Sequence, residues 1–126
     1  NTEGTVSDKS FVSYSEQDKK LIETRDALIK DVTSDMDEYR FYLAGEKIYH
    51  YAWHEFADII LEDSKKIFET GSEEEKISRK QFLIHTLKTI LILLHPFMPF
   101  ITEELWGIIN GSDDVKLIVE PWPYIS

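Results

Sequence analysis

Four side chains that could bind a metal ion stand four residues apart in the middle of the sequence: Glu46, His50, His54 and Asp58. On a helix this spacing puts them on one face, and two imidazoles placed in this way can bind one divalent cation. The pair His54-Glu55 is not followed by the second histidine of a zinc-protease motif. No Glu-x-x-His pair of the di-iron type recurs elsewhere either. A solvated polar face is therefore favoured, and we predict no metal.

Groups for catalysis are also missing. The chain of 126 residues has no cysteine, which excludes disulfides, thiolate metal sites and cysteine catalysis. It has no glycine-rich phosphate loop and no convincing pairing of a nucleophile with a base. Its longest apolar run, Ile90 to Leu94, is far shorter than the roughly 20 residues that cross a bilayer. With no signal-like N-terminus visible, we predict a non-catalytic cytoplasmic chain with no membrane contact.

Capping residues and apolar periodicity predict the helices that carry these side chains. Ser15 and Ser72 each stand three residues before an acid, the pattern of a helix start. Gly71 and Gly111 mark two helix ends. Helices are expected over about 15–37, 41–70, 72–95 and 99–110. Joined by short loops, they predict an all-α, up-and-down four-helix bundle with a short extended C-terminal segment, together spanning 15–124. Residues 1–14 are expected to be a disordered or partly ordered lead-in.

Four large side chains are expected to lie inside this bundle or against it. Arg25 falls within the apolar stripe of the first helix, so its stem should follow the core while its guanidinium reaches solvent or a carboxylate. Trp53 and Trp106 are expected in the core. Trp122, between two prolines, is expected to dock back onto the bundle as a rigid clasp.

Half of the basic residues map to one end of the bundle, where the first helix starts and the second turns into the third. They are Lys19, Lys20, Lys65, Lys66, Lys76, Arg79 and Lys80, seven of the 14 in the chain. Acidic residues share this end, and 24 acidic residues give the whole chain a formal net charge of −10. Nucleic-acid binding domains are usually basic, so a solvated charged face is the simpler interpretation.

Contact with nucleic acid is the sharper interpretation of the same end. Lysines there could position a phosphate backbone. Tyr14 and Phe68 could stack on unpaired bases, although each could equally be a residue at the end of the core.

A sharp joint between two helices is predicted by the stretch HPFMPFITEELW, which runs from His95 to Trp106. Pro96 has no N–H to donate and biases His95 away from helical geometry, so the preceding helix should stop there. Pro99 suits the first turn of the next helix, and Glu103 lies near its positive N-terminal end. His95 is expected to hydrogen-bond at this corner and to fix the joint.

The corner sequence resembles the run near the end of the anticodon-binding domain of class I valyl-tRNA synthetases. A second match is AGEKIYHYAWHEFADIILEDSK, from Ala44 to Lys65. The chain departs from the family pattern at Ile59 and Ile60, where Trp-Tyr is usual, and at Ala57, which is often Cys. The resemblance covers residues 11 to 124. Because the family keeps an acid at Asp58, a structural polar contact is expected there, to a basic residue such as Lys65 or Arg25 or to an aromatic hydroxyl or indole.

The resemblance implies that the chain is a non-catalytic fragment of a larger valine–tRNA ligase. The basic end, with Tyr14 and Phe68, would then receive the anticodon arm of a valine tRNA. The corner end would face the catalytic domain of the same parent chain. ATP and Mg²⁺ belong to that absent domain, so no cofactor is expected here, and the fragment is expected to be monomeric.

Two other interpretations stay open. An isoleucyl-type synthetase carries a related domain, although the corner sequence argues against it. A helical protein-interaction module would instead bind a protein through the polar face of the second helix, with an exposed apolar patch there.

Overall fold

The computed structural model describes residues 14–111 and 120–125, which form helices and connecting segments without a strand. In chain order the helices are α1 (Glu16–Asp37), α2 (Phe41–His50), η1 (Tyr51–Ile60), α3 (Leu61–Thr70), α4 (Glu73–Leu94) and α5 (Pro99–Asn110). The all-α class is confirmed, and each predicted helix boundary lies within one residue of the observed one. The lead-in before Tyr14 and the extended segment 115–119 lie outside the described residues.

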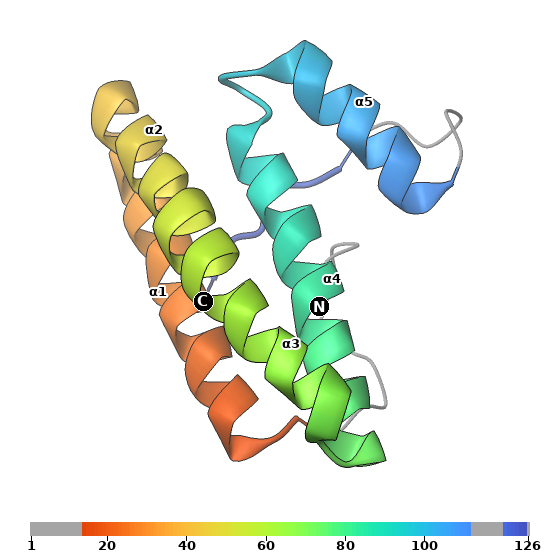
Figure 1. The fold of residues 1–126 in the computed structure, drawn as a ribbon. Coiled ribbons are helices and arrows are strands. Elements are labelled where there is room, and N and C mark those ends of the chain that lie inside the picture. Colours follow the sequence, from red (N-terminus) through yellow and green to blue (C-terminus); the bar gives the residue numbers. More distant parts are fainter. Residues whose placement is uncertain (1–13, 112–119, 126) are drawn as a thin grey trace.

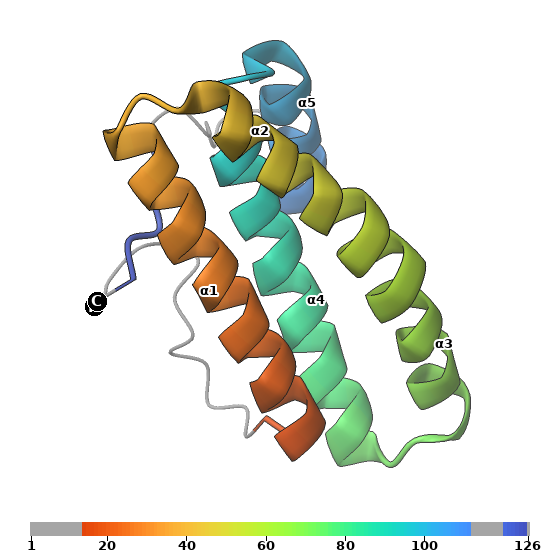
Figure 2. The same ribbon diagram turned by 90° about the vertical axis from the view of Figure 1, so that its left-hand side faces the viewer.

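Three long helical rods lie side by side, and α5 is inclined to them (Figures 1 and 2). The rods are α1, the continuous helix α2–η1–α3, and α4. The short helix α5 packs on the C-terminal half of α4, where Trp106 joins Leu91 and Ile92 in a buried cluster. The fourth helix therefore crosses one end of a three-rod core.

The middle of the second rod is a π-helix, where we expected a regular α-helix. The side chains that it and its neighbours bury are Ala44, Ile48, Tyr51, Phe56, Ile60 and Ser64. The step of five from Tyr51 to Phe56 is one residue longer than an α-helical turn, as in π geometry. Without that step, Glu55 would continue the buried stripe of Ile48 and Tyr51. The same shift leaves Ile59 exposed, since a regular helix would carry the stripe from Glu55 to it.

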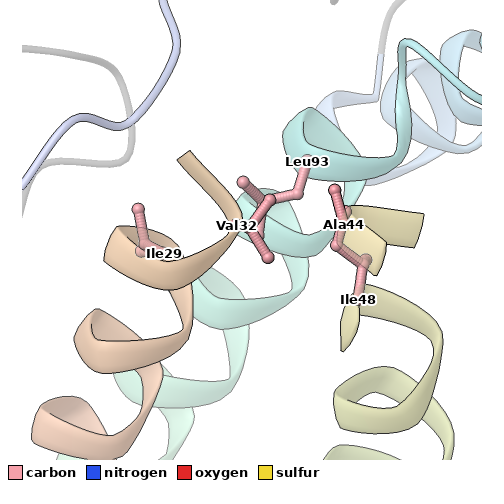
Figure 3. Close-up of a cluster of buried hydrophobic side chains, with 5 residues drawn as sticks. All are labelled: Ile29, Val32, Ala44, Ile48 and Leu93. Atoms are coloured by element: carbon pink, nitrogen blue, oxygen red, sulfur yellow. The ribbon is translucent and has the colours of Figure 1, made fainter. Parts of the chain in front are cut away.

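The core between the rods is aliphatic at the end where α1 turns into α2. Ile29 and Val32 of α1 meet Ala44 and Ile48 of α2, and Leu93 of α4 closes the cluster (Figure 3). The small side chain of Ala44, which is completely buried, lets the two helices approach closely.

Two serines cap helices as predicted, but in different ways. Ser72 and Glu75 form a complete capping box, with each side chain bonded to the other residue's backbone N–H. Ser15 accepts a hydrogen bond from the backbone N–H of Asp18, while the Asp18 carboxylate turns inward, away from the backbone of Ser15. The capping box of α1 is therefore only half formed.

The corner after α4 is fixed by His95, as predicted: its Nδ1 lies 2.9 Å from the hydroxyl oxygen of Thr102. The clasp is confirmed as well, because the indole N–H of Trp122 donates to the hydroxyl of Thr33 at 2.8 Å. Trp106 is buried as expected. The prediction for Trp53 is wrong, since its side chain is 58% exposed on the π-helix.

Gly71 ends the second rod because of close packing. Its φ of −76° suits any residue, but an added Cβ would lie 2.6 Å from the carbonyl oxygen of Ile67. Gly45, in contrast, has room for a side chain, because an added Cβ would lie 3.5 Å from the ring of Phe97, an ordinary van der Waals contact.

We expect Gly71→Ala to lower the free energy of unfolding by about 1–3 kcal/mol, because the backbone must shift to relieve the clash. Gly45→Ala lies inside α2 and should raise it by about 0.5–1 kcal/mol. Urea denaturation of the two variants measures both changes. Equal effects of the two substitutions would contradict this account of Gly71.

Candidate nucleic-acid interface

Three helices are tied together at the predicted basic end by one buried arginine. The Nε of Arg79 on α4 donates to Asp18 of α1 at 2.9 Å. Its Nη1 donates to Asp63 of α3 at 3.0 Å and to the hydroxyl of Ser64 at 2.9 Å. The hydroxyl of Ser78 donates to the other oxygen of Asp18. Every strong bond of this guanidinium is thus directed at the protein itself.

Arg79 was predicted to contact a ligand, and the structure places it inside the fold instead. Its side chain is 0% exposed, so it presents no charge at the surface. A buried charge is tolerated only when it is paired and hydrogen-bonded, which Asp18 and Asp63 achieve. The helical period could have predicted this burial, because Arg79 stands three residues before the apolar Phe82, on the same buried face.

A second buried arginine lies on α1. The Nη1 of Arg25 donates to the hydroxyl of Thr86 at 3.2 Å, and its guanidinium lies over the ring of Phe82 at 5.7 Å. Its Nε lies 3.4 Å from a carboxylate oxygen of the neighbouring Asp26. The stem follows the core and the guanidinium reaches a carboxylate, that of Asp26, as predicted, although the group stays buried.

The six lysines of this end are not equivalent. Three pair with a glutamate one helical turn away: Lys19 with Glu16, Lys65 with Glu62, and Lys76 with Glu73, at 3.1, 2.9 and 3.7 Å. The other three, Lys20, Lys66 and Lys80, are exposed and make no ion pair with a described residue. They belong to α1, α3 and α4, the three helices that Arg79 ties together. These three are the cations that this end can offer to a ligand.

The two aromatic candidates of this end also differ. Tyr14 is half-buried and packs against the cluster of Phe56, Ile60 and Phe82. Phe68 on α3 is 40% exposed. Phe68 is therefore the better placed of the two for stacking on a base.

The predicted polar face of the second rod makes only local contacts. The rings of His50 and His54 lie 5.0 Å apart, and His54 Nδ1 is 3.8 Å from Asp58. Asp58 thus meets a histidine, where a pair with Lys65 or Arg25, or a hydrogen bond from a Tyr or Trp, was expected. Within residues 14–111 and 120–125, three potential metal ligands nowhere come together.

The opposite end holds a second charge cluster around Asp35, whose side chain is 2% exposed. Lys47 donates to it at 2.6 Å and to Asp31 at 3.0 Å, and Arg40 donates to Asp35 at 2.9 Å. The hydrogen bond from Lys47, and after it the one from Arg40, hold the pKa of Asp35 below its ordinary value. This cluster locks the turn between α1 and α2.

Comparison with known proteins gives one family and a consistent set of relatives. Residues 18–126 match the model of the anticodon-binding domain of tRNA ligase. The chain is 39% identical over 98 residues to a valine–tRNA ligase of Streptococcus thermophilus, covering 78% of the chain and 11% of that protein. It is 35% identical over 116 residues to the valine–tRNA ligase of Laribacter hongkongensis, and this match covers 89% of the chain and 12% of that protein. With the valine–tRNA ligase of Streptococcus mutans the identity is 39% over 109 residues, and the match covers 86% of the chain and 12% of that protein.

The chain thus spans about an eighth or less of the length of these curated relatives. None of its described helices has the length and apolar content needed to cross a bilayer.

Removing the buried arginine should be costly. We expect Arg79→Met to lower the free energy of unfolding by about 3–5 kcal/mol, because the carboxylate of Asp18 is then buried without its cation. Lys80→Met, one residue away on the surface, should change it by no more than about 0.5 kcal/mol. Urea unfolding followed by circular dichroism compares the two variants. A similar loss in both would mean that the buried network contributes little.

The Asp35 cluster predicts a dependence of stability on pH. Because the folded-state pKa lies below the ordinary 3.8, the contribution of Asp35 is complete above that pH and is lost as the pH falls towards the lowered pKa. We expect Asp35→Asn to be less stable than the parent chain at neutral pH and to lose less stability on acidification. Asp37→Asn, an exposed change on the same helix, is the control. Parallel acid-unfolding curves for Asp35→Asn and the unsubstituted chain would contradict this role.

Proposed function

The chain belongs to the family of anticodon-binding domains of tRNA ligases, and we propose that residues 15–124 serve as this domain in a valine–tRNA ligase. The curated relatives that carry the name valine–tRNA ligase support the choice of amino acid. They also favour it over the isoleucyl alternative. The chain's own contribution is to hold the tRNA in place, while the parent's catalytic part joins valine to it.

The catalytic step belongs outside this sequence. ATP and Mg²⁺ would bind in the catalytic part, since this chain lacks a glycine-rich phosphate loop and its described residues bring no three metal ligands together. The domain acts by position: it binds the anticodon arm so that the distant acceptor end reaches the active site.

The end held together by Arg79 is the proposed tRNA surface. The observation that carries this assignment is the presence there of three exposed lysines, Lys20, Lys66 and Lys80, that pair with no acid of the described part of the chain. They would contact the phosphate backbone, and Phe68 would stack on an unpaired base. Lys19, Lys65 and Lys76 would add less, because each already has a glutamate partner. The buried Arg79 positions these helices without touching the RNA.

The other end exposes large aromatic groups beside the Asp35 charge cluster and suits a protein neighbour. Tyr39 and Tyr42 lie at the turn into α2, and Phe100, which is 91% exposed, starts α5 at the same end (Figure 1). Exposed aromatic groups of this size favour contact with another protein surface. We assign this end to the catalytic part of the same parent chain. The isolated chain is then a cytoplasmic monomer.

We expect the chain to bind valine tRNA weakly at low salt and to prefer it to the same tRNA with a changed anticodon. Lys20/Lys66/Lys80→Ala removes the unpaired cations, so it should weaken binding at least tenfold and reduce the dependence on salt. Lys19/Lys65/Lys76→Ala removes the same charge from the same end but only paired lysines, so its loss should be smaller. Fluorescence anisotropy with labelled tRNA measures both.

Binding that ignores the anticodon would place base recognition in another part of the parent protein. Equal losses in the two triple variants would show that net charge alone drives the contact.

A further inference from the structure

An exposed aromatic stripe runs along the second rod, from Tyr42 near the turn into α2 towards the middle of the rod, away from the lysines of the proposed tRNA surface. Tyr42, Tyr49 and Trp53 are 77, 62 and 58% exposed. They recur at steps of seven and four, the spacing of one helix face. The rings of Tyr49 and Trp53 stack in parallel, with centroids 6.5 Å apart and planes 8° apart. We call these three residues the aromatic stripe. Large apolar groups gathered in this way on a soluble protein mark an interaction surface.

A groove borders the stripe and gives it depth. It has a volume of about 1120 Å³ and is lined by residues of α1, α2 and η1, among them Ala27 and Leu28 of α1 and Tyr42 and Tyr49 of α2. The buried Tyr51 lines it as well. Two flanking helices with an open furrow between them suit a partner helix, whose side chains fill such grooves.

The charges around the groove are mainly acidic. Asp31, Glu46 and Glu55 line it, and its one lysine, Lys47, is already paired with Asp31 and with the buried Asp35. Asp58 adds a further exposed carboxylate on the same rod. Such a rim repels a phosphate backbone and attracts lysine and arginine side chains. A protein segment is therefore favoured over RNA.

The aromatic stripe continues onto the π-helix. The step of five after Tyr51 turns Phe56 and Ile60 into the core, while Trp53 stays exposed. Segments of this geometry are frequent at functional sites. The second rod thus uses one side for the core of this domain and the other for a partner.

We propose that this groove binds an amphipathic α-helix from elsewhere in the parent polypeptide. Its apolar side would pack on Tyr49 and Trp53, and its basic side chains would meet Glu46 and Glu55. The assignment of the partner rests on the proposed function, under which most of the parent lies outside this chain, as the 11–12% coverage of the relatives indicates. A tethered segment needs little intrinsic affinity, because its effective concentration is in the millimolar range.

The test is photo-crosslinking in the intact parent protein. A benzophenone-bearing amino acid replaces Trp53, or in a second preparation Tyr49, and the attached peptide is identified by mass spectrometry. The control position is Ile77, an apolar side chain that is 50% exposed on α4. We expect crosslinks from the stripe to one helical, lysine- or arginine-rich segment of the same molecule outside residues 1–126, with little from Ile77. Glu46→Lys with Glu55→Lys should reduce that yield at least fivefold.

Other products would overturn the proposal. Crosslinks to a second copy would make the stripe a dimer contact, and crosslinks that need added tRNA would make it an RNA contact. A yield no greater than that of the control would remove the docking site. Because the expected crosslink forms without tRNA, loss of anticodon-dependent binding with the crosslink intact would count against the tRNA assignment alone.

A second measurement keeps folding separate from docking. Trp53→Ser should leave the Tm of the 126-residue chain unchanged, since this side chain is exposed in it. The same change should lower the Tm of the intact parent, where the side chain would be covered. No shift in the parent would contradict the proposal.

Discussion

The arrangement of the three rods depends on one buried cation. Arg79 is fully enclosed, and its bonds to Asp18, Asp63 and Ser64 connect α4 with α1 and α3. Because an unpaired charge in that position is so unfavourable, only one relative placement of these helices satisfies it. The network acts together with the aliphatic cluster at the other end of the rods, which is apolar and therefore less selective for register.

The π-helix helps to form the buried network of Arg79. After the step of five that follows Tyr51, the inner face passes through Phe56 and Ile60 to Ser64. Ser64 is a partner of Arg79, and the adjacent Asp63 is another. A regular α-helix would have rotated this last stretch and moved Ser64 off the inner face. The unusual helix in the middle of the rod is thus coupled to the ion pairs at its end.

This architecture separates a lysine-bearing end from two aromatic surfaces, which share Tyr42. One end carries lysines on three helices, the opposite end carries exposed aromatic groups, and the side of the second rod carries the aromatic stripe with its acidic rim. A domain that holds an RNA arm while joined to a larger protein needs such a separation, because a phosphate backbone and an apolar protein surface demand opposite environments. The excess of acidic residues is compatible with RNA contact only because the unpaired lysines are local to one end.

The helices and their ends were determined by the sequence itself, since caps, prolines and apolar periodicity act within a few residues. Ser72 with Glu75, and His95 with the prolines after it, are examples. Family membership was also readable, because the corner motif is contiguous. Only the tertiary structure decided which charged side chains are inside. Arg79 and Lys80 are neighbours in sequence, yet one is the centre of the core network and the other is free on the surface. That difference depends on carboxylates 16 and 61 residues away along the chain, and the burial of Ser64 depends on a π step that the α-helical period could not reveal.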